Sequence, residues 1–261
     1  MKNTSTKADK EDPIRKYYDE SDINYWATIQ QIVIEHGLDS KFLLQNNLAF
    51  IQRRNLPRLL AHYEMFQKIK DLPGSIVELG VFCGNGLFTW ANFLETFCPG
   101  DRIRKVFGFD NFEGYKFFTE KDADAEVFTQ KHHHKLEVSA SMVHRLVKLH
   151  NDDNLLRGVE RCRLIDGDIV QKVPEFVEQN KGLRLCMLYC DANLYSPTKI
   201  GLEYLYPLVV PGGIIAFNAY GQNPWEGEGK ALDEFLEEHK IVAKLIRFPF
   251  STIPSCYFIK Q

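Results

Sequence analysis

Short apolar runs alternate along this chain with longer segments that carry apolar residues at helical spacing. Five of the short runs end at or beside a polar residue; they occupy residues 76–77, 105–110, 161–165, 183–190 and 213–217. The run at 183–190 is almost wholly apolar, which is typical of a parallel strand covered on both faces. The alternation predicts an α/β fold with a Rossmann-like, doubly wound and mostly parallel sheet.

The N-terminal part of the chain reads as helical. Residues 48–69 carry apolar residues at helical spacing, and the sequence DLPG at 71–74 stops the pattern. We therefore expect a helical extension over 13–73. The polar stretch 1–12 has no apolar segment of the kind found in a secretory signal, and we expect it to be a disordered tail.

The C-terminal part of the chain reads as a hairpin. Two strand-like runs, at 241–248 and 255–260, flank a turn that contains Pro and Ser. An antiparallel hairpin there brings the expected sheet to seven strands. Residues 74–261 should then form one ligand-binding domain.

A glycine-rich turn follows the first expected strand. Gly80, Gly84 and Gly86 form a G-x-x-x-G-x-G spacing, and residues 87–95 then carry a helical apolar pattern. Glycine lets a ligand approach the backbone closely, although glycine turns are also ordinary packing devices. The spacing differs from the G-x-G-x-x-G of dinucleotide sites. It suits a ligand without a pyrophosphate, such as S-adenosylmethionine.

Acidic residues stand at four of the expected strand ends: Glu78, Asp110, Asp168 and Asp191. In open α/β sheets, ligands bind outside the carboxyl ends of the strands. A single aspartate at such a place is as readily a helix cap, but four acids at successive strand ends favour a binding site. Asp110 is placed to accept hydrogen bonds from ribose hydroxyls, and Asp168 to meet an adenine amino group.

Residues 189–199 (YCDANLYSPTK) carry the most specific motif of the chain. They resemble the D-x-D-L-Y-x-x-T block of the macrocin O-methyltransferase family, and the likeness extends over residues 48–258. The pattern is closest to members that act on nucleotide-linked deoxysugars, such as the calicheamicin sugar methyltransferase. The resemblance implies a class I methyltransferase that uses S-adenosylmethionine and a divalent metal to methylate sugar hydroxyls. Together with the strand ends, it gives these expected cofactor-binding residues: Glu78, Gly80, Gly84, Asn85, Asp110, Phe112, Asp168 and Asp191.

The chain departs from the family pattern where the resemblance implies metal binding. The implied ligands are Asp191 and an acidic pair after the fifth strand, but the pair is Asn218 and Ala219 here. Asn193 stands in place of the second Asp, the candidate base, and a neutral amide cannot take a proton from a hydroxyl. Asp191 and Asn193 remain the expected catalytic residues. Asp191 and Asn218 form at best a weakened or lost metal site, so magnesium dependence is left open.

A long insertion, residues 111–150, follows the second expected strand and reads as a lid over the substrate side. It contains the sequence KHHHK at 131–135. Consecutive histidines cannot all face one ion on a regular element, which favours a polar patch over a metal site. His144, or a histidine of 132–134, could replace the missing base if the lid folds inward.

Composition excludes several classes of function. The net charge is −3, so no basic footprint indicates nucleic-acid binding, and no run of 18 apolar residues indicates a membrane span. The six cysteines are scattered and form no C-x-x-C motif, which makes the cytoplasm the default location. We also expect a homo-oligomer.

The leading hypothesis is an O-methyltransferase acting on a hydroxyl of a small sugar acceptor, a nucleotide-linked deoxysugar or a glycosylated natural product. One alternative is a pseudoenzyme that binds S-adenosylmethionine without catalysis, because three acidic positions are lost. Another is a metal-independent methyltransferase on a different small acceptor, such as a phenol or carboxylate, which ionises more readily than a sugar hydroxyl.

Overall fold

The computed structural model describes residues 13–132 and 138–261. The tail expected at 1–12, together with 133–137 of the histidine-containing segment, lies outside the described residues. The chain divides into two units, Met1–Asn55 and Leu56–Gln261, and each is considered by itself.

The first unit consists of helices with little core. Its elements are α1 (Pro13–Glu35), α2 (Ser40–Gln45), α3 (Asn47–Phe50) and the short 3₁₀ helix η2 (Arg53–Asn55). Tyr25 donates a hydrogen bond to the Phe50 carbonyl at 2.9 Å, and Gln52 Nε2 donates to Asp22 Oδ1 at 2.7 Å. These polar contacts connect α1 to the segment around α3, since neither α2 nor α3 has a buried residue.

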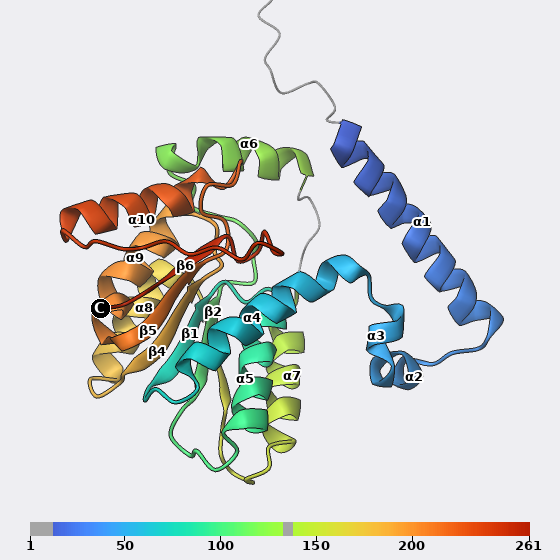
Figure 1. The fold of residues 1–261 in the computed structure, drawn as a ribbon, viewed down its shortest axis with the longest axis horizontal. Helices are drawn as coiled ribbons and strands as arrows, with labels where there is room; N and C mark the ends of the chain where they lie inside the picture. The colour runs from blue at the N-terminus through green and yellow to red at the C-terminus, as the bar shows by residue number, and fades with distance from the viewer. Residues whose placement is uncertain (1–12, 133–137) are drawn as a thin grey trace, which may run out of the picture. The chain divides into compact units, whose positions relative to one another are not determined.

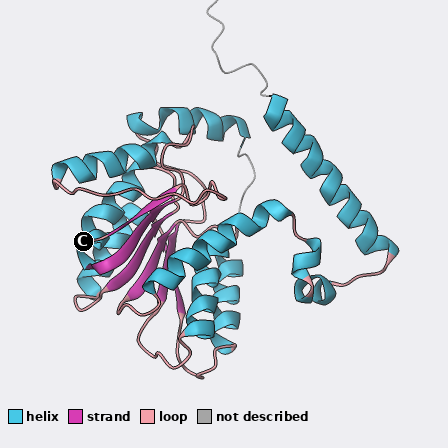
Figure 2. Ribbon diagram, in the orientation of Figure 1, coloured by secondary structure: helices cyan, strands magenta, loops and turns pink. Residues whose placement is uncertain are grey.

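The second unit is built on one sheet, shown in magenta in Figure 2, whose strand order is β3-β2-β1-β4-β5-β6. Its first five strands are parallel, and β6 pairs antiparallel with β5. The chain therefore crosses over after β3 and extends the sheet on the other side of β1. The strands are β1 (Ser75–Leu79), β2 (Val106–Asp110), β3 (Cys162–Asp166), β4 (Leu185–Cys190), β5 (Val209–Phe217) and β6 (Cys256–Ile259).

The prediction of seven strands is wrong for the described residues, which form six. Residues 241–248 were expected to pair as a strand, but they make only the single bridge between Ile246 and Tyr257. Their apolar side chains pack against the two core clusters without a continuous ladder. Pro249, which has no N–H to donate, follows directly. The apolar alternation thus reflects packing rather than strand pairing.

Helices cover both faces of the sheet, as Figure 1 shows. One core cluster joins the sheet to α4 (Leu56–Ile69), α5 (Asn85–Phe97) and α7 (Ala140–Asp152). The other joins it to α8 (Ile169–Gln179), α9 (Tyr195–Leu205) and α10 (Glu226–Glu238). This is the doubly wound arrangement that the apolar runs predict. The remaining elements are η3 (Glu120–Asp122), α6 (Ala123–His132) and η4 (Tyr206–Leu208).

The single helix expected over 48–69 is interrupted. Helix α3 ends at Phe50 and α4 begins at Leu56, with Pro57 in its first turn. Proline fits the first turn of a helix and cannot continue one from before. Helix α4 buries Ala61, Met65 and Phe66 against the sheet, so it belongs to the second unit and can carry side chains to the strand edge.

The segment expected to be a lid contains two different parts. Helix α7 packs against β3 and α5 and is a crossover helix of the scaffold. The loop after β2 contributes residues 111–117 to a cavity, and Thr129 and Val138, on either side of the undescribed stretch, also line it. No helix among the described residues is both long and apolar enough to cross a membrane.

Candidate active site at the carboxyl edge of the sheet

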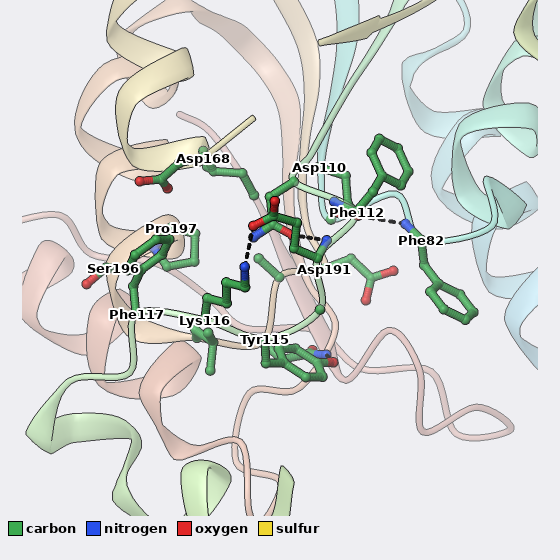
Figure 3. A pocket seen from close by; sticks show the side chains of 18 of the residues that line it. Phe82, Asp110, Phe112, Tyr115, Lys116, Phe117, Asp168, Asp191, Ser196 and Pro197 are labelled. Carbon is green, nitrogen blue, oxygen red and sulfur yellow. Dashed lines mark hydrogen bonds and ion pairs between the residues drawn. The ribbon is translucent and has the colours of Figure 1, made fainter. Parts of the chain in front are cut away.

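A cavity of about 450 Å³ lies at the carboxyl ends of the parallel strands. Figure 3 shows that Asp110, Asp168 and Asp191 border it together, with the aromatic rings of Phe82, Phe112 and Tyr115 nearby. The topology explains this convergence, because parallel strands end at the same edge. The expected site residues that line it are Gly80, Asp110, Phe112, Asp168, Asp191, Asn193 and Asn218.

Within the glycine turn, Gly80 lines the cavity and Gly84 does not. Gly80 has φ +92°, and a Cβ there would collide with the Asp191 carbonyl, so glycine lets the ends of β1 and β4 approach closely. Gly84 has φ +93°, and a Cβ there would collide with the ring of Phe88. Gly84 and Asn85 begin α5 but do not line the cavity, so any role toward a ligand passes through the shape of the turn.

Glu78 is not among the described residues that line the cavity. Its side chain is buried, 1% exposed, and a Cβ on Gly86 would collide with its carboxylate. Neither carboxylate oxygen accepts a hydrogen bond of normal geometry from the described residues. Burial, and next the charge of Asp191, raise the pKa of Glu78 well above its ordinary value.

Asp110 holds the loops after β1 and β2 in place. Its Oδ2 accepts hydrogen bonds from the N–H groups of Val81 and Phe82 at 2.7 and 2.8 Å. Its Oδ1 accepts from Phe112 N–H at 2.8 Å. Phe82 and Phe112 both have positive φ, +49° and +55°, which non-glycine residues rarely adopt. One carboxylate therefore stabilises two unusual loop conformations at the cavity wall.

Asp168 combines the two roles considered for a strand-end acid. Its Oδ1 accepts from Val170 N–H at 3.0 Å and caps α8. It also lines the cavity. The helix-cap role is observed, and the position permits a ligand contact as well.

Asp191 is paired with a residue that the sequence motifs did not indicate. Arg58 Nη2 donates to Asp191 Oδ2 at 2.5 Å, across 133 positions of sequence, and both residues line the cavity. Burial raises the pKa of Asp191 to about 6 against the opposing effect of Arg58. Arg58 precedes Ala61, His62 and Met65 on the buried face of α4. A basic residue on the apolar face of an amphipathic helix was the signal that could have identified it.

The two asparagines form a chain of hydrogen bonds. Asn193 Nδ2 donates to the Tyr115 hydroxyl at 2.7 Å, and Asn218 Nδ2 donates to Asn193 Oδ1 at 3.1 Å. The Tyr189 hydroxyl in turn donates to Asn218 Oδ1 at 3.1 Å. Both amide oxygens are therefore already engaged, and Asn193, at φ +61°, is held in a left-handed conformation by these contacts.

Glu228 of α10 fastens the loops after β4 and β5 from below. Its Oε1 accepts from Ala219 N–H at 2.6 Å and its Oε2 from Asn193 N–H at 3.3 Å. The side chain is fully buried. Burial is the main cause that raises the pKa of Glu228 to about 8. This carboxylate points at the backbone and does not line the cavity.

The residues at the ends of β4 and β5 do not fit a divalent metal of the family type. Such ions prefer several carboxylate or carbonyl oxygens, yet Asp191 is the sole carboxylate that the described part of these two loops presents to the cavity. The amide oxygens of Asn193 and Asn218 carry no charge, and each already accepts a hydrogen bond. Arg58 already holds one oxygen of Asp191.

The cavity does fit a nucleoside ligand that carries positive charge. Its described charged residues are four acids and two bases, and each base is paired with an acid, Arg58 with Asp191 and Lys116 with Glu113. Asp110 and Asp168 remain without a cationic partner among these lining residues. This balance favours a sulfonium over a pyrophosphate.

Of the histidines proposed as a substitute base, His144 is the one whose side chain the structure describes, and it does not lie at the cavity. His144 Nε2 lies 2.7 Å from Asp166 Oδ2 on the exposed side of α7 and β3, and it does not line the cavity. His133 and His134 lie in the stretch outside the described residues.

The doubly wound sheet brings the glycine turn and the strand-end acids to one cavity at the carboxyl edge of an α/β fold. A family model described as macrocin-O-methyltransferase (TylF) matches residues 37–253. The chain belongs to this family and is an S-adenosylmethionine-dependent O-methyltransferase.

Three similar structures support the fold. The crystal structure titled CalS11, calicheamicin methyltransferase, has a TM-score of 0.80 at 24% identity, over 96% of this chain and 94% of that one. The apo structure of CalS11, titled TDP-rhamnose 3'-O-methyltransferase, gives 0.72 at 23% identity and 96% coverage of both. The O-methyltransferase NovP gives 0.63 at 25% identity, over 78% and 80%. A comparison with curated protein sequences finds no significant match.

Proposed function

We propose that this protein transfers a methyl group from S-adenosylmethionine to a hydroxyl of a sugar, on a nucleotide-linked deoxysugar or a glycosylated natural product, and that it needs no divalent metal to do so. The observation that carries the proposal is the position of Asp191. It lies in one cavity with Gly80, Asp110 and Asp168 and is held by a guanidinium. Membership of the family supports methyl transfer. The similarity to CalS11, a calicheamicin methyltransferase described as a TDP-rhamnose 3'-O-methyltransferase, supports a sugar as the acceptor.

The cofactor would supply an activated methyl group on a positively charged sulfur. In our proposal Gly80, Asp110, Phe112 and Asp168 hold it directly, because they line the cavity. Of the other expected cofactor residues, Glu78, Gly84 and Asn85 act through the shape of the glycine turn, and Asp191 faces the acceptor. The acidic wall favours binding of a cation.

The chain has two tasks in such a displacement: to align the acceptor oxygen and to remove its proton. Asp191 is the proposed base: it would accept the hydroxyl proton as the bond from oxygen to the methyl carbon forms and the bond from that carbon to the cofactor sulfur breaks. A pKa of about 6 leaves it ionised at neutral pH, yet makes it a stronger base than an ordinary aspartate. Asn193 lines the cavity and would orient the acceptor.

The test is methyl transfer from radiolabelled S-adenosylmethionine to a panel of TDP-deoxysugars that includes TDP-rhamnose, with catechol as a phenol control. Each reaction is run in EDTA and in magnesium. We expect a methylated sugar at similar rates in both. Product from catechol alone would refute the sugar acceptor. Activity lost in EDTA and restored by micromolar magnesium would refute metal independence.

A further inference from the structure

Arg58 lies on helix α4, outside the strand-end loops, and it makes an ion pair with Asp191 in the cavity. Its Nη2 donates to Asp191 Oδ2 at 2.5 Å, and the two side chains are 33% and 13% exposed. Its Nε is buried and donates no hydrogen bond to any described residue. The acid and phenol that face it besides Asp191 are Glu78 and Tyr189. The guanidinium is thus paired with the Asp191 carboxylate and has the side chains of Glu78 and Tyr189 as neighbours.

The surroundings of Asp191 leave this guanidinium as the local positive charge. The amide oxygen of Asn193 accepts a hydrogen bond from Asn218, and that of Asn218 accepts one from the Tyr189 hydroxyl. The carboxylate of Glu228 is turned to backbone N–H groups. A hard cation at this place would meet one available carboxylate oxygen and a guanidinium, so it would lack ligands and be repelled.

We propose that Arg58 occupies the functional place of a divalent ion: it holds Asp191 oriented toward the acceptor, and it excludes metal from that carboxylate. The proposal rests on the function proposed above and deepens it. A guanidinium suits this role because it is always charged and its donors have a fixed planar geometry. Arg58 acts through Asp191 and is therefore a positioning residue.

Manganese binding tests the exclusion without needing to know the acceptor. The comparison is made in the Asn218→Asp variant, which has a second carboxylate near Asp191. Aspartate and asparagine side chains have nearly the same shape. Electron paramagnetic resonance reports free Mn²⁺, so its loss measures binding. We expect the natural protein to leave Mn²⁺ free and N218D to bind it weakly. Adding Arg58→Gln to N218D should tighten binding by about tenfold or more, whereas adding Arg58→Lys, which keeps the charge, should not.

Arg184→Gln in the same background is the matched control. Arg184 is exposed next to the amino end of β4 and donates to the Leu183 carbonyl, far along the strand from Asp191. It should leave Mn²⁺ affinity unchanged. Equal Mn²⁺ affinity in N218D with and without Arg58→Gln would overturn the proposal. So would micromolar Mn²⁺ binding by the natural protein.

Calorimetry with S-adenosylhomocysteine tests whether Arg58 instead binds the cofactor, and whether the proposed function itself fails. We expect Arg58→Gln to bind it as the natural protein does. A tenfold or greater loss confined to Arg58→Gln would show instead that Arg58 holds the cofactor, and would overturn the proposal. Failure of the natural protein to bind S-adenosylhomocysteine would contradict the proposed function, while the manganese result would still decide whether Arg58 excludes metal.

Discussion

The two halves of the sheet's carboxyl edge are built from different kinds of residue. At the end of β2 and the start of α8, Asp110 and Asp168 use their carboxylates to hold backbone N–H groups. At the ends of β4 and β5, two amides and a guanidinium surround Asp191. The first half has the acids expected at its strand ends, and the second half lacks most of the carboxylates that the family resemblance implies.

In our proposal the first half is the cofactor side and the second half is the acceptor side. The two sides stand on different strands, and separate contacts stabilise them. Asp110 fixes the loops after β1 and β2, whereas Glu228 fixes the loops after β4 and β5. Loss of carboxylates at Asn193 and Asn218 therefore leaves the cofactor wall intact.

The largest expected effect is on the acceptor side. Asp191→Asn should lower turnover by about 10²–10⁴-fold, the usual contribution of a general base, because the amide cannot accept the proton. Binding of S-adenosylhomocysteine, measured by calorimetry, should stay within about twofold of that of the natural protein. Retention of full turnover would remove Asp191 from the mechanism.

The pH dependence of unfolding probes Glu228. Because its pKa is raised to about 8 in the folded protein, the folded state holds a proton that the unfolded state has lost above its ordinary pKa. Its contribution to stability is therefore greatest at low pH and declines as the pH rises toward 8, by on the order of a few kcal/mol. Urea unfolding from pH 5 to 8 should show this decline.

Glu228→Gln is the variant that checks this assignment. It should cost about 1–3 kcal/mol at pH 5, because one backbone N–H loses its acceptor, and it should flatten the decline between pH 5 and 8. A decline of the same size in the variant would assign the pH dependence to other groups.

The next effect is on the cofactor side. Asp110→Ala should weaken the binding of S-adenosylhomocysteine by about 1–3 kcal/mol, because three loop N–H groups lose their acceptor. Turnover at saturating cofactor should fall much less than in Asp191→Asn, because the base is untouched. Calorimetry and steady-state kinetics together measure the two quantities. Unchanged cofactor affinity would mean that the loops after β1 and β2 do not form the binding wall.

The smallest effect separates the two roles of Asp168. Asp168→Asn keeps a good helix cap, whereas Asp168→Ala removes it and should cost about 0.5–2 kcal/mol of stability. If Asp168 is only a cap, Asp168→Asn should bind S-adenosylhomocysteine like the natural protein. If its charge also meets the ligand, Asp168→Asn should bind more weakly at unchanged stability in urea.

The sequence by itself determined the parallel strands, their order of appearance and the acids at their ends. These features are local, because an apolar run followed by a polar residue reports burial and then exposure within a few positions. The same local evidence misled at residues 241–248, whose apolar side chains pack on the core clusters without forming a ladder. It also joined α3 to α4 across Pro57.

Only the tertiary structure decided what surrounds Asp191. Arg58 reaches it across 133 positions, and Glu228 reaches Asn193 across 35. The amide oxygens of Asn193 and Asn218 are directed away from metal ligation by partners on other strands and loops. Such pairings depend on which helix face is buried against which strand end and on how burial changes the cost of each charge. Local spacing can mark Arg58 as a basic residue on the apolar face of a helix, but it does not identify Asp191 as the acid with which Arg58 pairs.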